Sequence, residues 1–348
     1  MSRLLTSEPY AQRDDQTLLD ELNELTAHHR AGCQPFARIW PDPAPAGSLE
    51  ELPFVHVGLF KQMDLATSAA DLKHERTLGS SGTSGAVSRV PLDSKSLELQ
   101  ARSTQSILMH HLGPGRRPLI VIDSVASLRQ RGQVSARTAA AMSLRPLSSR
   151  IAFLLDDSND PASARWEVLE EALDSAATVL VFGHSWILWQ VWNEPGPPQS
   201  VREALMGHRL QFVHSGGWKK LEAARVDRRV FDDRLLEGLG KDSMVLDFYG
   251  LAEQVGIIFP LCAAGWRHPP RWAAAIVRDS WTLESSIGRS GQLQLLNSLA
   301  WGAPYHSVLT EDLATLDRGP CACGLIGDRF RLEGRVPKSE LRGCANQS

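Results

Sequence analysis

Ser80-Ser81-Gly82-Thr83-Ser84-Gly85 is the stretch of sequence that decides how the fold is interpreted. Its glycines let the backbone turn through positive φ and approach a ligand closely. Successive N–H groups in such a loop form a concave nest, to which the hydroxyl groups add donors, and a triphosphate suits that nest. No lysine follows Gly85, so this is not the loop that ends in Gly-Lys-Ser/Thr. Clusters of serine and glycine are also typical of plain turns, so both interpretations stay open.

The composition limits the classes of function that the chain can have. Of its 348 residues, 43% are hydrophobic and 22% are charged, and the net charge is −3. This slight acidity argues against a nucleic-acid partner, which needs a basic face. No apolar run reaches the ~18 residues of a membrane span, and residues 1–10 lack the apolar centre of a signal peptide. We therefore expect a cytoplasmic globular protein with no membrane span.

The pattern of apolar residues changes along the chain. Helical periodicity alternates with short apolar runs in the first part, which predicts a parallel sheet with helices on its faces. After about residue 255 the strands become shorter and turns more frequent. The expected helices are 12–30, 94–112, 133–144 and 162–175, and the expected buried strands are 119–122, 151–155 and 178–182. The sequence thus predicts an α/β fold with domains at 1–255 and 256–348.

Four further segments strengthen the interpretation of the first loop, namely residues 211–220, 245–254, 306–313 and 333–344. The first ends an apolar run with a glycine pair, against whose bare backbone a flat ring can lie. The second holds an aromatic ring, a turn glycine and a carboxylate. The third presents two acidic residues after a short strand, and the fourth is a basic turn. Each one alone also has a plain explanation as a strand edge, a turn or a solvated charge.

In this order, the segments resemble the adenylate-forming superfamily of acyl-CoA synthetases and aryl-acid ligases. Residues 80–85 are similar to its phosphate loop, 248–253 to its Tyr-Gly-x-Thr-Glu motif, 310–312 to its Thr-Gly-Asp motif, and 334–335 with 342–343 to its Gly-Arg hinge. The closest resemblance is to the acyl-protein synthetases of bacterial luminescence operons and their secondary-metabolite relatives, including those of phenazine pathways. Ser-Gly-Thr-Ser-Gly, His-Ser-Gly-Gly-Trp-Lys, Leu-Thr-Glu-Asp-Leu, Cys-x-Cys-Gly and Gly-Arg-x-Pro-Lys-Ser-Glu-Leu-Arg-Gly-Cys carry this resemblance.

The resemblance implies a fold and a reaction. The fold is an adenylate-forming N-terminal-type core of parallel-sheet subdomains, plus a smaller β-rich subdomain. The reaction has two steps: a carboxylate attacks the α-phosphate of ATP to give an acyl-adenylate and pyrophosphate, and a thiol then takes the acyl group. ATP and Mg²⁺ are the implied cofactors, a carboxylic (fatty) acid is the implied substrate, and a fatty-acid reductase or a carrier protein is the implied acyl acceptor.

The resemblance also implies roles for individual residues. Glu253 would bind Mg²⁺, which prefers carboxylate oxygen. Tyr249 would pack on adenine opposite Gly216-Gly217, and Asp312 would accept the ribose hydroxyls. Arg335 and Lys219 would neutralise phosphate charge. The full expected nucleotide-binding set is Ser81, Gly82, Thr83, Ser84, Gly85, Gly216, Gly217, Phe248, Tyr249, Gly250 and Asp312.

The acid pocket is harder to assign. The expected lining residues are His184, Trp186, His214 and Ala252. A hydrogen-bonded core histidine is an equal alternative for His184. The spacing of Trp186, Trp189 and Trp192 is also typical of a helix that packs into a core.

Two features depart from the superfamily pattern. Ala252 stands where a threonine is usual, so a hydroxyl near the α-phosphate is lost. The chain ends shortly after the hinge motif, so we expect that the mobile C-terminal domain and its lysine are absent. Arg335, Lys338 or Lys219, or else a partner, would then supply the missing positive charge, and free CoA is a poor choice of acceptor.

The five cysteines are an odd number in a long chain, which argues against a disulfide framework. Cys344 matches the acyl-carrying cysteine of the family by position, and Arg342 and Lys338 nearby would favour its thiolate. A spare surface cysteine is the alternative. Cys321-Ala-Cys323 either begins a metal site, for which zinc needs four ligands, or forms a tight turn with two thiols.

Three functions remain open at this point. The first is an ATP-dependent ligase that loads an acid on a protein thiol, its own Cys344, to supply a reductase. The second is a free-standing enzyme that activates an aromatic or short acid in secondary-metabolite biosynthesis and passes the acyl-adenylate to a carrier or reductase. The third is a non-catalytic nucleotide-binding subunit, which Ala252 and the missing domain suggest.

Overall fold

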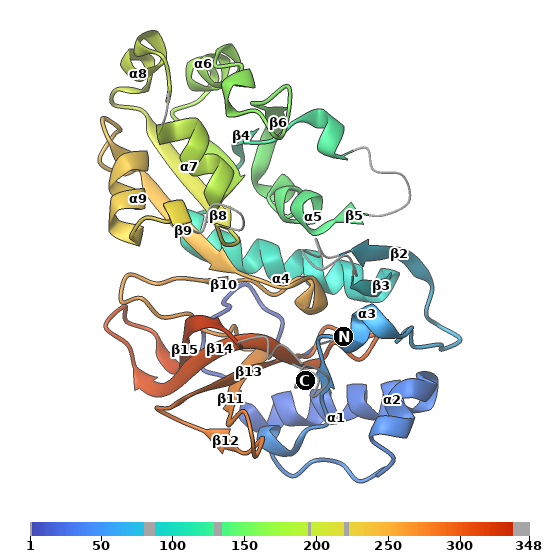
Figure 1. Cartoon of the computed structure of the whole chain (residues 1–348). Helices are drawn as coiled ribbons and strands as arrows, with labels where there is room; N and C mark the ends of the chain where they lie inside the picture. Colours follow the sequence, from blue (N-terminus) through green and yellow to red (C-terminus); the bar gives the residue numbers. More distant parts are fainter. Residues whose placement is uncertain (1, 80–87, 129–133, 194–195, 219–222, 337–348) are drawn as a thin grey trace, which may run out of the picture.

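The strands form three sheets in the part of the chain that the computed structural model describes, residues 2–79, 88–128, 134–193, 196–218 and 223–336 (Figure 1). The helices are α1 (Asp15–Gly32), α2 (Gln34–Ile39), α3 (Leu59–Gln62), α4 (Ser94–Leu112), α5 (Ala136–Met142), α6 (Glu167–Ser175), α7 (Ser185–Asn193), α8 (Gln199–Leu205) and α9 (Arg228–Leu236). None of the described helices is long and apolar enough to cross a membrane.

The first sheet has six strands in the order β10-β9-β8-β7-β4-β6, and all but β10 run parallel. The strands are β4 (Arg117–Val121), β6 (Ser148–Phe153), β7 (Thr178–His184), β8 (Arg209–Ser215), β9 (Met244–Tyr249) and β10 (Phe259–Pro260). Continuous apolar runs form the central strands because helices cover both faces of a parallel sheet. The expected α/β class is thus confirmed.

The second sheet is mostly antiparallel, in the order β1-β14-β13-β11-β12, and β15 pairs with β14. Its strands are β1 (Val55–His56), β11 (Ala273–Arg278), β12 (Ser285–Ser286), β13 (Ser290–Asn297), β14 (Ser307–Pro320) and β15 (Ile326–Arg335). A small third sheet holds β2 (His74–Gly79), β3 (Arg89–Asp93) and β5 (Val134–Ser135).

Both large sheets contain a short strand from the other side of residue 255. Strand β1, early in the chain, pairs with β14, whereas β10 follows residue 255 and pairs with β9. Two-residue strands of this kind carry no periodic signal. The division into domains at 1–255 and 256–348 stays a prediction.

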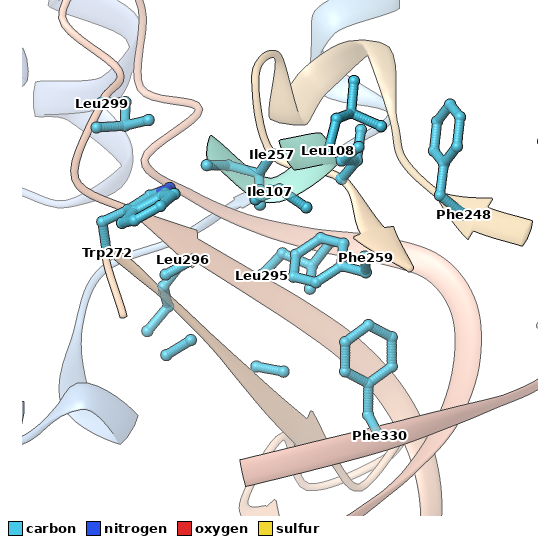
Figure 2. Packing of buried hydrophobic residues seen from close by; sticks show 14 of the residues in the cluster. Ile107, Leu108, Phe248, Ile257, Phe259, Trp272, Leu295, Leu296, Leu299 and Phe330 are labelled. Atoms are coloured by element: carbon cyan, nitrogen blue, oxygen red, sulfur yellow. The ribbon is translucent and has the colours of Figure 1, made fainter. Parts of the chain in front are cut away.

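Helix α4 lies between the two large sheets (Figure 1). It begins where the Asp93 carboxylate accepts the backbone N–H of Ser96, an N-cap that satisfies a donor without an intrahelical partner. Figure 2 shows Ile107 and Leu108 of this helix in one apolar cluster with Phe259 of β10 and Phe330 of β15. This shared core therefore fixes the position of one sheet relative to the other.

The tryptophans of α7 belong to a second core on the outer face of the parallel sheet. Trp192 is buried and its ring lies 5.0 Å from that of Phe212, while the ring of Trp189 stacks on that of Phe231 at 5.7 Å. Trp186 packs against the same cluster. The structure thus places this stripe of tryptophans in a packed layer.

Gly256 allows the closest approach between α4 and the segment that follows β9. Its φ is +81°, and a Cβ atom there would lie 2.3 Å from Cβ of Gln100. Its carbonyl also accepts hydrogen bonds from the hydroxyls of Ser103, at 2.7 Å, and Thr104, at 3.2 Å. Only glycine fits both the backbone conformation and the space.

We predict that Gly256→Ala strongly destabilises the fold. Positive φ costs an alanine about 1–2 kcal/mol, and the clash with α4 adds about 1–3 kcal/mol, as overpacking does elsewhere. Gly238→Ala is the matched control, because Gly238 has φ +76° with no atom within 4 Å of the added Cβ. Urea denaturation should show the larger loss for Gly256→Ala, and equal losses would contradict the packing argument.

Candidate functional site

The carboxyl ends of three parallel strands bring several predicted residues to one edge of the first sheet. In the strand register, His184 of β7 lies beside Ser215 of β8, which lies beside Phe248 of β9. Gly216 and Tyr249 follow directly at the same edge. In open α/β sheets this edge is where ligands bind.

Tyr249, Asp312 and Arg335 are in direct contact, as the motif order predicts for one site. The Tyr249 hydroxyl donates to Oδ2 of Asp312 at 2.7 Å, and Nε of Arg335 donates to Oδ1 at 3.2 Å. Asp312 and Arg335 face each other across β14 and β15. Burial, together with the Asp312 carboxylate, raises the pKa of Tyr249. This cluster joins the edge of the first sheet to the second.

Irregularities in the second sheet orient Asp312. The register shifts between Leu313 and Ala314 on β14, and again between Gln292 and Gln294 on β13. The hydroxyl of Thr310 accepts the backbone N–H of Asp312 at 3.1 Å. Bulges of this kind turn a side chain out of the regular alternation, and they are frequent next to functional sites.

Glu253 lies in a short 3-10 turn, Ala252–Gln254, just after β9. Its side chain is only 4% exposed, and burial raises its pKa, against the opposing effect of a hydrogen bond with the Ser88 side chain. Among the described residues none forms an ion pair with it, although Lys61 and Glu311 act on it electrostatically. A buried carboxylate in this state gains most from a cation.

Ser88 lies just before β3, where the chain is again described after the glycine loop. Gly79 at the end of β2 pairs with Arg89 at the start of β3, so residues 80–88 connect two antiparallel strands. Because Ser88 contacts Glu253, the end of this connection reaches the predicted metal ligand. No sequence motif identifies Ser88 as the partner of Glu253.

Several predicted residues lie outside the described part of the chain, namely Ser81, Gly82, Thr83, Ser84, Gly85, Lys219 and Cys344. Their roles stay predictions.

The glycine pair after β8 is held next to His184. Gly216 has φ +82°, and a Cβ atom there would lie 3.2 Å from Nδ1 of His184, whereas a Cβ on Gly217 would meet no atom of the described residues within 4 Å. Nδ1 of His184 donates to the carbonyl of Ser215 at 3.1 Å. The described residues therefore leave the backbone at Gly217 uncovered, as a ring-binding surface requires.

The side chain of His214 faces helix α9. It pairs with Gly183 rather than His184 in the register, and neighbouring side chains on a strand point to opposite faces. Its ring lies 4.8 Å from that of Phe231 on α9, and its Nδ1 lies 2.9 Å from the Ser185 hydroxyl. Burial lowers its pKa to about 4, so it is neutral at pH 7. A shared role of the two histidines in one acid pocket stays a prediction.

The remaining predicted residues have distinct surroundings. Phe248 is 5% exposed and belongs to the core between the sheets (Figure 2). The ring of Tyr249 packs near those of Phe259 and Phe330. Gly250 has room for a Cβ atom, and Ala252 is half-buried against an apolar cluster. Phe248 is thus placed as a core residue beside the site.

Glu311 and His56 also lie near the cluster, and only His56 was missed in the sequence. Glu311 lies 3.5 Å from Nη2 of Arg335. His56 of β1 has its pKa lowered by burial, which the charge of Glu311 opposes. No motif marks His56, because β1 is far from β14 in the sequence and the two meet only in the sheet.

Solved structures of other proteins have a similar fold. The fold is similar to that of 2-hydroxyisobutyryl-CoA ligase in an open conformation with 2-HIB-AMP and CoA, at TM-score 0.67 and 15% identity over 93% of this chain and 70% of that one. It is similar to the same ligase in the postadenylation state with 2-HIB-AMP, at TM-score 0.65 and 17% identity over 92% and 68% of the two chains. A search of curated proteins found no match.

A family model described as "Acyl-protein synthetase, LuxE" matches residues 8–348. That match spans nearly the whole chain, and it agrees with the motif order and with the fold of the adenylate-forming ligases. The chain therefore belongs to the LuxE acyl-protein synthetase family.

Proposed function

We propose that this protein activates a fatty acid with ATP as an acyl-adenylate and transfers the acyl group to a protein thiol, its own Cys344. Membership of the acyl-protein synthetase family supports adenylate formation. The observation that carries the proposal is the cluster of Tyr249, Asp312 and Arg335 beside a buried Glu253, at the carboxyl edge of the parallel sheet. The acid and the acceptor are the proposed part.

The residues present fit ATP and Mg²⁺. The Asp312 carboxylate would bind the ribose hydroxyls, a charge-assisted pair of hydrogen bonds. To do so it would exchange or share the hydrogen bonds that it now forms with Tyr249 and Arg335. The open backbone at Gly217 would lie against the adenine ring, and Glu253 would hold Mg²⁺. Bound Mg²⁺ supplies positive charge to the phosphates during the displacement.

The position where β15 ends supports the proposal of Cys344 as acceptor. The backbone N–H of Val336 donates to the carbonyl of Glu311, beside Asp312, so the chain leaves the sheet at the cluster itself. Cys344 is nine residues beyond Arg335, and nine residues extend over at most about 30 Å. A segment of this length would be long enough for the thiol to reach an adenylate bound at Asp312.

The first experiment is acid-dependent exchange of pyrophosphate into ATP across a panel of fatty, aromatic and short acids. Exchange with long-chain acids supports the proposal. A short acid is the second candidate, because the similar ligase structures contain the adenylate of 2-hydroxyisobutyrate. Exchange with short or aromatic acids alone would favour that candidate, and no exchange with any acid would favour a non-catalytic nucleotide-binding subunit.

We predict that Glu253→Gln lowers the rate of adenylation ~10²-fold or more, because the ligand for the metal is lost. Burial raises the pKa of Glu253, so its charge opposes folding above that pKa and the neutral glutamine removes this cost. The variant should therefore melt no lower than the parent at pH 7 without Mg²⁺. Unchanged exchange at limiting Mg²⁺ would contradict the assignment.

The same pKa predicts a pH dependence in the parent protein. As the pH falls through the raised pKa of Glu253, the carboxylate gains a proton and loses affinity for Mg²⁺. The concentration of Mg²⁺ that gives half-maximal exchange should then rise at a pH above the ordinary titration range of glutamate, about 4.3. An unchanged Mg²⁺ requirement as the pH falls from 8 to that range would contradict this role.

We predict that Asp312→Asn weakens ATP and AMP binding alike, by at least about 10-fold, because each charge-assisted bond contributes roughly 1.5–3 kcal/mol. Tyr249→Phe is the matched variant: it removes the other partner of the same hydrogen bond but keeps the ring. Calorimetry should show a smaller loss for Tyr249→Phe. Equal affinities for the parent and Asp312→Asn would place Asp312 outside the nucleotide site.

We predict that Cys344→Ser forms the acyl-adenylate normally but no longer carries a hydroxylamine-labile acyl group. A serine oxygen is a far weaker nucleophile than a thiolate. Cys33→Ser is the control, because Cys33 is buried at 1% exposure in another part of the fold. Normal labelling of Cys344→Ser, or an acyl group mapped to Cys321 or Cys323, would overturn the choice of acceptor while leaving adenylation intact.

A further inference from the structure

Two turns far apart in the sequence face each other beside the second sheet. The first follows β10 and reads Cys262-Ala-Ala-Gly265-Trp266. The second joins β14 to β15 and reads Cys321-Ala-Cys323-Gly324-Leu325. Backbone hydrogen bonds in both directions between Arg267 and Phe330 hold the two segments together. The turns thus lie where the end of the parallel sheet meets the long hairpin.

The two turns have the same backbone structure. In each, the N–H of the first cysteine donates to the carbonyl four residues later, at 2.8 Å, and the glycine N–H donates back to the cysteine carbonyl, at 2.9 Å. Each glycine has positive φ, +76° at Gly265 and +93° at Gly324. The first turn also donates the N–H of Trp266 to Sγ of Cys262 at 3.4 Å.

The turns bring four ligand atoms of one chemical class together. Sγ of Cys262, Cys321 and Cys323 and a ring nitrogen of His268 all lie within 4.8 Å of one another. Sγ of Cys262 and Sγ of Cys321 are 4.0 Å apart, and Sγ of Cys323 is 3.4 Å from Nε2 of His268. Ligands at the corners of a tetrahedron around zinc are about 3.5–3.8 Å apart, given Zn–S and Zn–N bonds of about 2.3 and 2.0 Å.

Two alternatives fit less well. A disulfide needs sulfurs about 2.05 Å apart, whereas the described cysteines are free. A pair of thiols in a tight turn would account for Cys321 and Cys323. It would not account for the second turn of the same structure, which brings Cys262 to the same place, or for the nearby His268. His268 is only 4% exposed and hydrogen-bonds to the backbone of Asp328, the kind of contact that fixes the ring of a metal-binding histidine.

We propose that Cys262, His268, Cys321 and Cys323 bind one structural Zn²⁺ ion. Binding replaces three thiol protons with three Zn–S bonds, and the lone pair of Nε2 forms the fourth bond, so three protons leave and the site has one net negative charge. The positive charge of Arg329 acts electrostatically on Cys321. Arg329 also stabilises the hairpin, because its Nη1 donates to the carbonyls of Gly319 and Pro320 at 2.9 Å. All four positions are filled by protein, as in a structural site.

The position of the site indicates what zinc would stabilise. The second turn closes the hairpin whose other end pairs Asp312 with Arg335, and the first turn follows directly from β10, which pairs with β9. A zinc ion would thus cross-link the hairpin to the end of the parallel sheet. Because it lies at the opposite end of the hairpin from Asp312, its role is to hold the fold and not to contact the nucleotide.

The test is the metal content of the full chain, purified under reducing conditions from zinc-supplemented cells. Elemental analysis should find about one zinc per chain, and X-ray absorption should show three sulfurs at about 2.3 Å and one nitrogen at about 2.0 Å. Reduced protein stripped by a chelator should rebind Zn²⁺ in competition with a chromophoric chelator, and its melting temperature should rise on rebinding.

Variants make the assignment specific. Cys323→Ser changes a half-buried ligand and should lower zinc affinity at least tenfold, whereas Cys33→Ser, a buried cysteine elsewhere, should keep the full metal content. The proposal is overturned if the reduced parent binds no zinc, if mass spectrometry finds a native disulfide among these cysteines, or if a different metal is stoichiometric. It is also overturned if Cys33→Ser and Cys323→Ser lose zinc equally.

Discussion

The largely buried ion pair between Arg267 and Asp247 is the polar interaction that, within the shared apolar core, orients the two sheets. Nη2 of Arg267 lies 2.6 Å from Oδ2 of Asp247 on β9, and Nη1 donates to the carbonyl of Phe259 on β10 at 2.7 Å. The backbone of the same arginine pairs with Phe330 of β15. One side chain thus contacts β9 and β10 while its own backbone is fixed to the hairpin of the second sheet.

This ion pair contributes more to the specificity of the strand arrangement than to the net free energy of folding. Burial opposes ionisation of Asp247, but Arg267 and His214 hold its pKa below the usual range. Such a pair contributes little net free energy, because desolvation offsets the attraction, yet the loss of one partner leaves a buried charge and costs about 3–5 kcal/mol. The planar guanidinium can donate its hydrogen bonds in only a narrow range of geometries. The pair therefore favours one arrangement of β9, β10 and β15, and Tyr249 meets Asp312 in that arrangement.

The sequence predicted those parts of the structure that local pattern determines. The apolar runs at 119–122 and 178–182 became β4 and β7, and the periodicity at 94–112 matches α4. Motif order placed Tyr249, Asp312 and Arg335 in one site, and these three side chains are in contact. Local pattern succeeds here because periodic burial and short motifs are properties of consecutive residues.

The rest depends on contacts between distant segments, for which single residues carry no signal. Strand β1 has two residues, and it is recognisable as a strand only because it pairs with β14. Ser88 is the partner of Glu253 because the residue just before β3 lies next to the turn after β9. The matching Cys-Ala-Ala-Gly and Cys-Ala-Cys-Gly turns are visible in the sequence. Their convergence with His268 requires the folded hairpin.

The buried histidines show why Glu253 stands out as functional. His29 is fully buried, and its two ring nitrogens pair with the Thr67 hydroxyl at 2.7 Å and the Ala300 carbonyl at 2.9 Å. Burial lowers its pKa, so it is neutral and its polar atoms are satisfied, which makes it an ordinary core residue. Glu253 is nearly as buried, yet its ionised form has a hydroxyl partner and no ion pair among the described residues. A fold gains nothing from burying that charge, which supports the proposal that a cation brought with the substrate is the partner of Glu253.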